Sequence, residues 1–129
     1  MEKVTFKGVR VYKAASYRPE KRIKNKVRLI LSPALYKQFS TVLDREYNRL
    51  VFMNGYNHRR TDYMPVKKMS DGNWQLSARS TIKNKRFDDA AADEMIEAGR
   101  IDCTVYLDAY ATDCNQGVRC RLVDYTILE

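Results

Sequence analysis

The sequence predicts a mainly β fold of the α+β class, with five strands and two helices in one domain over residues 1–129. Three observations indicate this class. Five segments alternate apolar and polar residues, which is typical of strands with one buried face. Two further segments carry apolar residues at helical spacing next to capping residues. No linker, internal repeat or low-complexity tract divides the chain, so its 129 residues are expected to share one core.

The first two strands are expected over about residues 3 to 16 and 26 to 31. The alternation of the first is interrupted at Gly8, and a glycine within a strand often marks a bulge or a sharp bend. The second alternates through Val27, Leu29 and Leu31. The segment between them is expected to be a loop.

Two helices are expected, over about residues 33 to 53 and 88 to 98. Ser32 and Pro33 form a typical helix start, because serine caps early N–H groups and proline at the first position loses no hydrogen bond. Asn54-Gly55 and Gly99 are the expected ends. Three aromatic residues of the long helix are expected to pack in the core rather than to contact a ligand: Tyr36, Tyr47 and Phe52.

The remaining strands are expected at about residues 73 to 82, 103 to 110 and 118 to 128. The last two form a hairpin around a turn at residues 112 to 117. Residues 56 to 72 are polar, end in the turn signal Asp71-Gly72 and are expected to form a loop.

This element order is that of an OB-fold, a five-stranded barrel with a helix between its third and fourth strands. The inserted long helix, at residues 33 to 53, is additional to a minimal barrel and is expected to cap one end or to pack on the outside. OB-folds bind ligands on strands two and three and in the loops from strand one to two and from four to five. The basic run of the sequence falls in the first loop, and residues 111 to 116 fall in the second.

The positive charge is concentrated in the first half of the chain. The net charge is +8 from 24 Lys and Arg against 16 Asp and Glu. The densest run lies between residues 18 and 28, where a polyanion would relieve the self-repulsion by releasing its condensed counterions. Nucleic acid is therefore the expected partner, and a solvated loop that keeps the protein soluble is the alternative.

Other ligands and compartments fit the sequence less well. No apolar run reaches the ~20 residues of a membrane-spanning helix, and charges occupy the N-terminal region where a signal peptide is apolar. We therefore expect no membrane partner and a cytoplasmic location, in the host cytoplasm if the protein is viral. The three cysteines lack CxxC spacing and there is one histidine, so no metal, cofactor or nucleophilic triad is expected.

The C-terminal stretch resembles the closing hairpin of the single-stranded DNA-binding proteins of tailed bacteriophages. The resemblance rests on IDCTVYLDAY at residues 101–110, NQGVRCRL at 115–122 and YTIL at 125–128. It implies an OB-fold that binds single-stranded DNA in phage replication or recombination. Many members end in an acidic tail that recruits replication proteins, whereas Asp124 and Glu129 are the acids among the last six residues here. Recruitment through such a tail is not expected.

Binding an unpaired strand without sequence preference requires cations for the phosphates and aromatic faces for the bases. Six aromatic residues are candidates for stacking: Tyr12, Tyr17, Tyr56, Tyr63, Trp74 and Tyr110. Each could instead be half-buried in the barrel wall, and for Trp74 this alternative is at least as strong because it alternates with Leu76 and Ala78. The expected phosphate contacts are Arg18, Lys21, Arg22, Lys24, Lys26, Arg28, Arg59, Arg60, Arg79, Lys83, Lys85 and Arg86.

Several alternatives remain open on the sequence. RNA fits the same features as DNA, and a homo-oligomer is compatible with them. An adaptor or inhibitor that binds an acidic host protein would also suit the positive charge. A small nuclease is the enzyme alternative to the non-enzymatic function expected here, with magnesium held by Asp88, Asp89 and Asp93, although acids at a helix start usually oppose the helix dipole.

Overall fold

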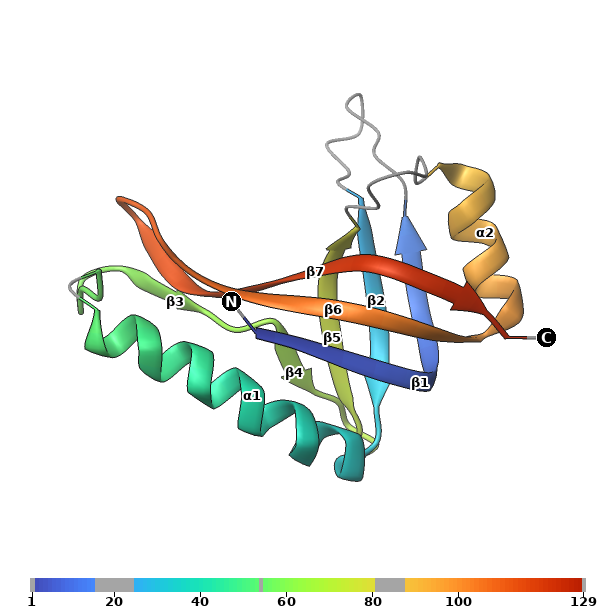
Figure 1. The fold of residues 1–129 in the computed structure, drawn as a ribbon, viewed down its shortest axis with the longest axis horizontal. Helices are drawn as coiled ribbons and strands as arrows, with labels where there is room; N and C mark the ends of the chain where they lie inside the picture. Colours follow the sequence, from blue (N-terminus) through green and yellow to red (C-terminus); the bar gives the residue numbers. More distant parts are fainter. Residues whose placement is uncertain (1, 16–24, 54, 81–87, 129) are drawn as a thin grey trace.

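The computed structural model describes residues 2–15, 25–53, 55–80 and 88–128, which form a strongly curved sheet with two helices on its outside (Figure 1). The five longer strands lie where the sequence predicts strands, and the two helices where it predicts helices. In chain order the elements are β1 (Glu2–Ala15), β2 (Lys26–Leu31), α1 (Pro33–Phe52), β3 (Thr61–Tyr63), β4 (Val66–Lys68), β5 (Trp74–Ser80), α2 (Asp89–Ala98), β6 (Arg100–Ala111) and β7 (Asn115–Ile127).

The five longer strands close into a barrel in the order β1-β2-β5-β7-β6. Neighbouring strands are antiparallel except β5 and β7, which pair in parallel through Arg79 with Arg121 and Ser80 with Leu122. The β6–β1 pairing completes the ring. This order, with α2 between the third and fourth barrel strands, is the OB-fold topology, so the predicted fold class is confirmed.

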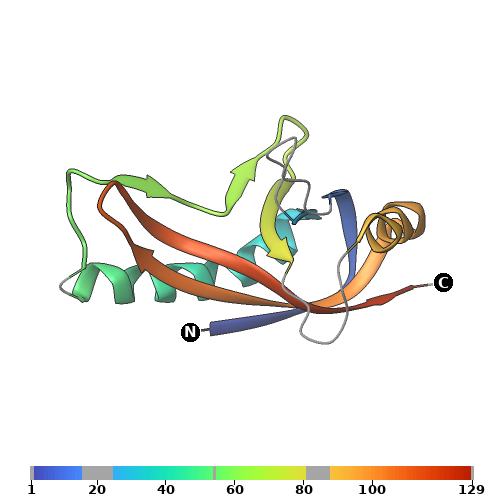
Figure 2. The ribbon, with the colours of Figure 1, turned by 90° about the horizontal axis from the view of Figure 1, so that it is seen from above.

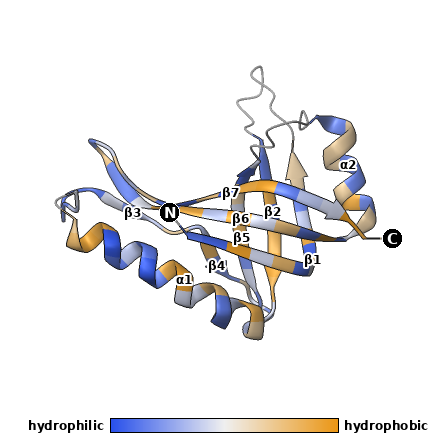
Figure 3. Cartoon of the chain, in the orientation of Figure 1, coloured by the Kyte–Doolittle hydropathy of each residue, from blue (hydrophilic) through white to orange (hydrophobic). Residues whose placement is uncertain are grey.

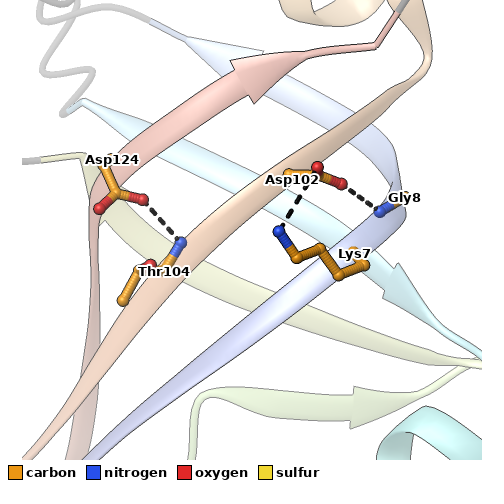
Figure 4. Close-up of polar contacts among 5 residues, drawn as sticks. All are labelled: Lys7, Gly8, Asp102, Thr104 and Asp124. Carbon is orange, nitrogen blue, oxygen red and sulfur yellow. Dashed lines mark hydrogen bonds and ion pairs between the residues drawn. The ribbon is translucent and has the colours of Figure 1, made fainter.

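Bulges interrupt the ladders of the long barrel strands, and an aspartate carboxylate lies at two of them (Figure 4). Gly8 takes a left-handed φ of 62° where β1 shifts register against β6, as the sequence predicted. Its N–H donates to a carboxylate oxygen of Asp102 at 2.7 Å, and the Lys7 amine lies 3.8 Å from the other oxygen. At the second bulge, Asp124 accepts the Thr104 N–H at 3.1 Å. These acids satisfy donors at the points where the ladder is interrupted, which allows the strands to curve.

The long helix α1 packs on the outside of the barrel, which is one of the two positions expected for it. It runs along β6, β1 and β7, and the ring centroid of Phe39 lies 6.0 Å from that of Phe6 on β1. Glu46 is also buried, and its carboxylate accepts the Ala109 N–H of β6 at 3.3 Å. The helix therefore supports the part of the β6–β7 hairpin that extends beyond the barrel.

The predicted helix starts are confirmed. Ser32 caps α1 by accepting the Leu35 N–H, and Asp88 caps α2 by accepting the Ala91 N–H. Gly99 ends α2 at a φ of 77°. The prediction for Phe52 is wrong, because its side chain is 86% exposed at the last position of α1, beyond the part of the helix that the barrel covers.

The prediction of a loop over residues 56 to 72 is wrong in part, since β3 and β4 lie within it. Each has three residues and joins the sheet through one neighbour: β3 runs parallel to β7, and β4 antiparallel to β5. Strands this short show no alternation, which is why their pairing could not be read from the sequence. At β3, a Cβ on Gly117 would lie 2.0 Å from the Tyr63 carbonyl oxygen, so the close approach requires glycine.

The barrel interior contains the apolar faces of its strands. Buried residues include Val27, Leu29, Leu76, Val105 and Leu122. Two cysteines, Cys103 and Cys120, belong to this core, and burial raises the pKa of the Cys103 thiol to about 12. No helix in the described segments is long and apolar enough to cross a membrane.

Candidate nucleic-acid interface

A groove of about 510 Å³ lies on the barrel where β2, β5, β7 and β6 adjoin and where β3 ends. The adjoining ends of β2 and β5 are hydrophilic, in contrast to the apolar stretches nearer their middles (Figure 3). The charged and aromatic side chains that line the groove are four cations, two tyrosines and one acid: Lys26, Arg79, Arg119, Arg121, Tyr63, Tyr110 and Asp108.

The strand register brings three of these cations into one row. Lys26 on β2 is the pairing partner of Arg79 on β5, and Arg79 is the partner of Arg121 on β7. Neighbouring strands lie about 4.8 Å apart, so the three positive charges are close together across the groove. Lys26 and Arg79 are exposed, and neither has a carboxylate partner among the residues that the structure describes. An anion that bridges these charges would relieve their repulsion.

Two tyrosines flank this row of cations. The ring centroid of Tyr110 on β6 lies 4.0 Å from the guanidinium carbon of Arg119, a cation–π contact. Tyr63, at the end of β3, is 39% exposed. Burial is the main cause that raises the pKa of both phenols, so both rings are uncharged at neutral pH. Neutral rings beside fixed cations can stack on bases while the cations contact phosphates.

Two further predicted residues lie beside the groove. Arg28 on β2 is close enough to Tyr63 for its charge to favour the phenolate and partly oppose the rise of the Tyr63 pKa. It pairs with Lys13 on β1, whose amine lies 5.4 Å from the ring centroid of Tyr12. Tyr12 is 42% exposed. The cationic face therefore continues from β2 to β1.

Apart from Tyr12 and Arg28, four described residues of the predicted site do not line the groove. Tyr56, Arg59 and Arg60 lie in the segment that joins α1 to β3, where the Arg60 guanidinium donates to the Gly55 carbonyl. The Trp74 ring is stacked on Tyr36 of α1, with centroids 3.7 Å apart and planes within 4°, and it packs against the core. The structure thus places Trp74 in the packing alternative, because Tyr36 covers one face of its ring.

Eight predicted contacts lie outside the described residues. These contacts are Tyr17, Arg18, Lys21, Arg22, Lys24, Lys83, Lys85 and Arg86. They remain predictions from the sequence.

Sequence reasoning missed two groove cations and one groove acid: Arg119, Arg121 and Asp108. A signal for the cations was present, because Arg119 and Arg121 alternate with the buried residues Val118, Cys120 and Leu122 along β7. In an OB-fold the last strand lies beside the third, so alternation combined with topology would have placed them next to Arg79.

The described segments hold no group of three or more His, Cys, Asp or Glu side chains that could bind a metal ion. Asp88, Asp89 and Asp93, the acids of the nuclease alternative, lie at the start of α2, where Asp88 accepts the Ala91 N–H at 2.9 Å. Figure 2 shows α2 at the opposite end of the molecule from the tip of the β6–β7 hairpin.

No protein-family model and no curated protein sequence matches the chain. Solved structures of the single-stranded DNA-binding protein from bacteriophage Enc34 do resemble it. The structure in complex with single-stranded DNA has a TM-score of 0.62 at 11% identity and covers 98% of this chain and 86% of its own. The C-terminally truncated form has a TM-score of 0.61 at 10% identity, with coverages of 95% and 82%. The resemblance seen in the closing hairpin is therefore confirmed for the whole fold: the chain has the OB-fold of this phage protein.

Proposed function

We propose that this chain is one OB-fold domain that binds single-stranded DNA without a strict sequence requirement and performs no catalysis. The observation that carries the proposal is the row of Lys26, Arg79 and Arg121 beside two neutral tyrosines in one groove. Cations in the row would contact successive phosphates, and Tyr63 and Tyr110 would stack on the unpaired bases between them. The structural neighbour solved with single-stranded DNA supports this ligand class.

The position of the groove supports the same conclusion. It involves the second and third strands of the barrel, β2 and β5, where OB-folds bind oligonucleotides. The predicted basic loop ends directly before Lys26, so its cations would extend the same surface. A role in protecting single strands during phage replication or recombination, in the host cytoplasm, would follow from this binding.

The decisive experiment compares fluorescently labelled single-stranded DNA, duplex DNA and single-stranded RNA of equal length over a salt series. We expect single-stranded DNA to bind more tightly than duplex, because bases in a duplex cannot stack on the tyrosines. The logarithm of the affinity should fall by roughly 0.7 per phosphate contact for each tenfold rise in salt. Equal binding of duplex and single strands, or an affinity that is independent of salt, would contradict the proposal. Equal binding of RNA would extend the ligand class to both polynucleotides.

A further inference from the structure

The groove contains one feature that phosphate binding does not explain, the carboxylate of Asp108 on β6. Asp108 is half-buried, and within the described part of the chain its carboxylate makes no hydrogen bond or ion pair. Its cross-strand partner is Arg119, whose guanidinium lies over the Tyr110 ring. A negative charge among the groove cations repels phosphate. Asp108 would therefore lower the affinity of the groove for the sugar–phosphate backbone of a bound DNA strand.

The position of Asp108 suits contact with a base. Tyr106, Asp108 and Tyr110 alternate with the buried residues of β6, so their side chains leave the same face of the strand. Residues two apart on a strand are separated by about 7 Å. A base that stacks on Tyr110, or on the Arg119 plane beside it, would therefore bring its Watson–Crick edge close to the Asp108 carboxylate.

The chemistry of a carboxylate limits which bases it accepts. An ionised carboxylate only accepts hydrogen bonds, so it requires donors on the base edge. Cytosine offers its exocyclic amino group to such an acceptor. Thymine offers one ring N–H between two carbonyl oxygens, which the carboxylate would repel.

On the basis of the proposed function, we propose that Asp108 selects bases that carry an exocyclic amino group at one position of the groove, with cytosine preferred over thymine. The remaining positions bind through stacking and phosphate contacts and tolerate every base. Asp108 thus gives a sequence-tolerant interface a preference in base composition.

The test measures the affinity of the full chain for oligo(dC) and oligo(dT) of about 20 nucleotides, a length that covers an OB-fold site. Slightly alkaline buffer keeps cytosine unprotonated. We expect the wild-type protein to prefer oligo(dC) by about tenfold, as for a hydrogen bond to a charged group. Asp108→Asn should reduce the ratio towards one by improving oligo(dT) binding, because an amide can donate to a thymine carbonyl.

The matched control is Asp44→Asn, which makes the same change at an exposed position of α1 that does not line the groove. This variant should keep the wild-type ratio. The inference is wrong if the wild-type protein binds the two polymers equally, or if Asp108→Asn raises both affinities by the same factor, since Asp108 would then only adjust the charge. Failure of the wild-type protein to bind either polymer would instead reject the proposed function, and the inference with it.

Discussion

The groove and the far end of the β6–β7 hairpin both contain polar side chains but arrange them in opposite ways. At the hairpin end, the buried Gln116 side chain accepts the Asn57 N–H, donates to the Asn57 carbonyl at 2.8 Å and donates to Asp62 at 2.7 Å. Asp62 also accepts the Tyr47 hydroxyl, and this hydrogen bond raises the pKa of Tyr47 well above its usual value. In the groove, Lys26 and Arg79 have no carboxylate partner among the described residues.

The difference distinguishes polar groups that stabilise the fold from neighbouring cations that an anion could bridge. Buried polar atoms that satisfy one another stabilise a unique arrangement, and removing one leaves its partners without hydrogen bonds. Neighbouring like charges destabilise the free protein and become favourable when an anion binds. Mutations at the hairpin end should therefore affect stability, and mutations in the groove should affect binding.

The largest expected effect is that of Gln116→Ala on stability. The substitution leaves the N–H and carbonyl of Asn57 without this partner and removes a donor to Asp62, so the free energy of unfolding should fall by about 3 kcal/mol. Urea unfolding followed by circular dichroism measures the loss. The control is Gln38→Ala on the exposed side of α1, which should change the free energy of unfolding little. An unchanged unfolding midpoint for Gln116→Ala would show that the network does not hold the hairpin.

The double substitution Lys26→Ala with Arg79→Ala should weaken DNA binding without lowering the stability of the fold. Single-stranded DNA affinity should fall by roughly tenfold or more at low salt, and the salt slope should decrease by about 1.4 because two phosphate contacts are lost. Stability should be kept or rise slightly, since two like charges are removed. The control is Lys67→Ala with Lys68→Ala on β4, which removes the same charge from a surface that does not line the groove. Equal loss in the two double variants would indicate attraction by net charge alone.

A smaller effect is expected for Tyr63→Leu, which keeps an apolar side chain but removes the ring. Loss of one base stack should weaken single-stranded DNA binding by about 1 to 2 kcal/mol with little change in salt slope. Tyr63→Phe keeps the ring and should bind like the wild-type protein. If Tyr63→Phe loses as much affinity as Tyr63→Leu, the hydroxyl rather than the ring makes the contact.

The smallest expected effect is a difference in chemical reactivity among the three cysteine thiols. Cys114 is exposed at the hairpin tip, whereas Cys103 and Cys120 are buried and burial raises the pKa of both. At neutral pH we expect a thiol reagent to modify one cysteine in the native protein and all three in denaturant, because the buried groups stay protonated. Cys114→Ser should abolish the native reaction. Rapid modification of a second thiol would show that the barrel opens readily.

The helix starts and the barrel strands were predictable because their signals are local. Ser32 and Asp88 cap the helices where the sequence places them, and Gly8 forms the predicted bulge. The inward alternation of β5 and β6 gave their buried faces. Each of these features depends on residues within about one turn of helix or a few positions of strand.

Tertiary structure decided the composition of the groove, the stacking of Trp74 on Tyr36 and the exposure of Phe52. Arg79 and Arg121 become neighbours through the parallel pairing of strands that lie far apart in the chain, and no local period encodes that register. Trp74 stacks on Tyr36 because α1 packs beside it, and β3 exists because β7 offers it a backbone edge. Alternation tells which side of a strand faces the core, whereas the neighbours on the other side depend on how the whole chain closes.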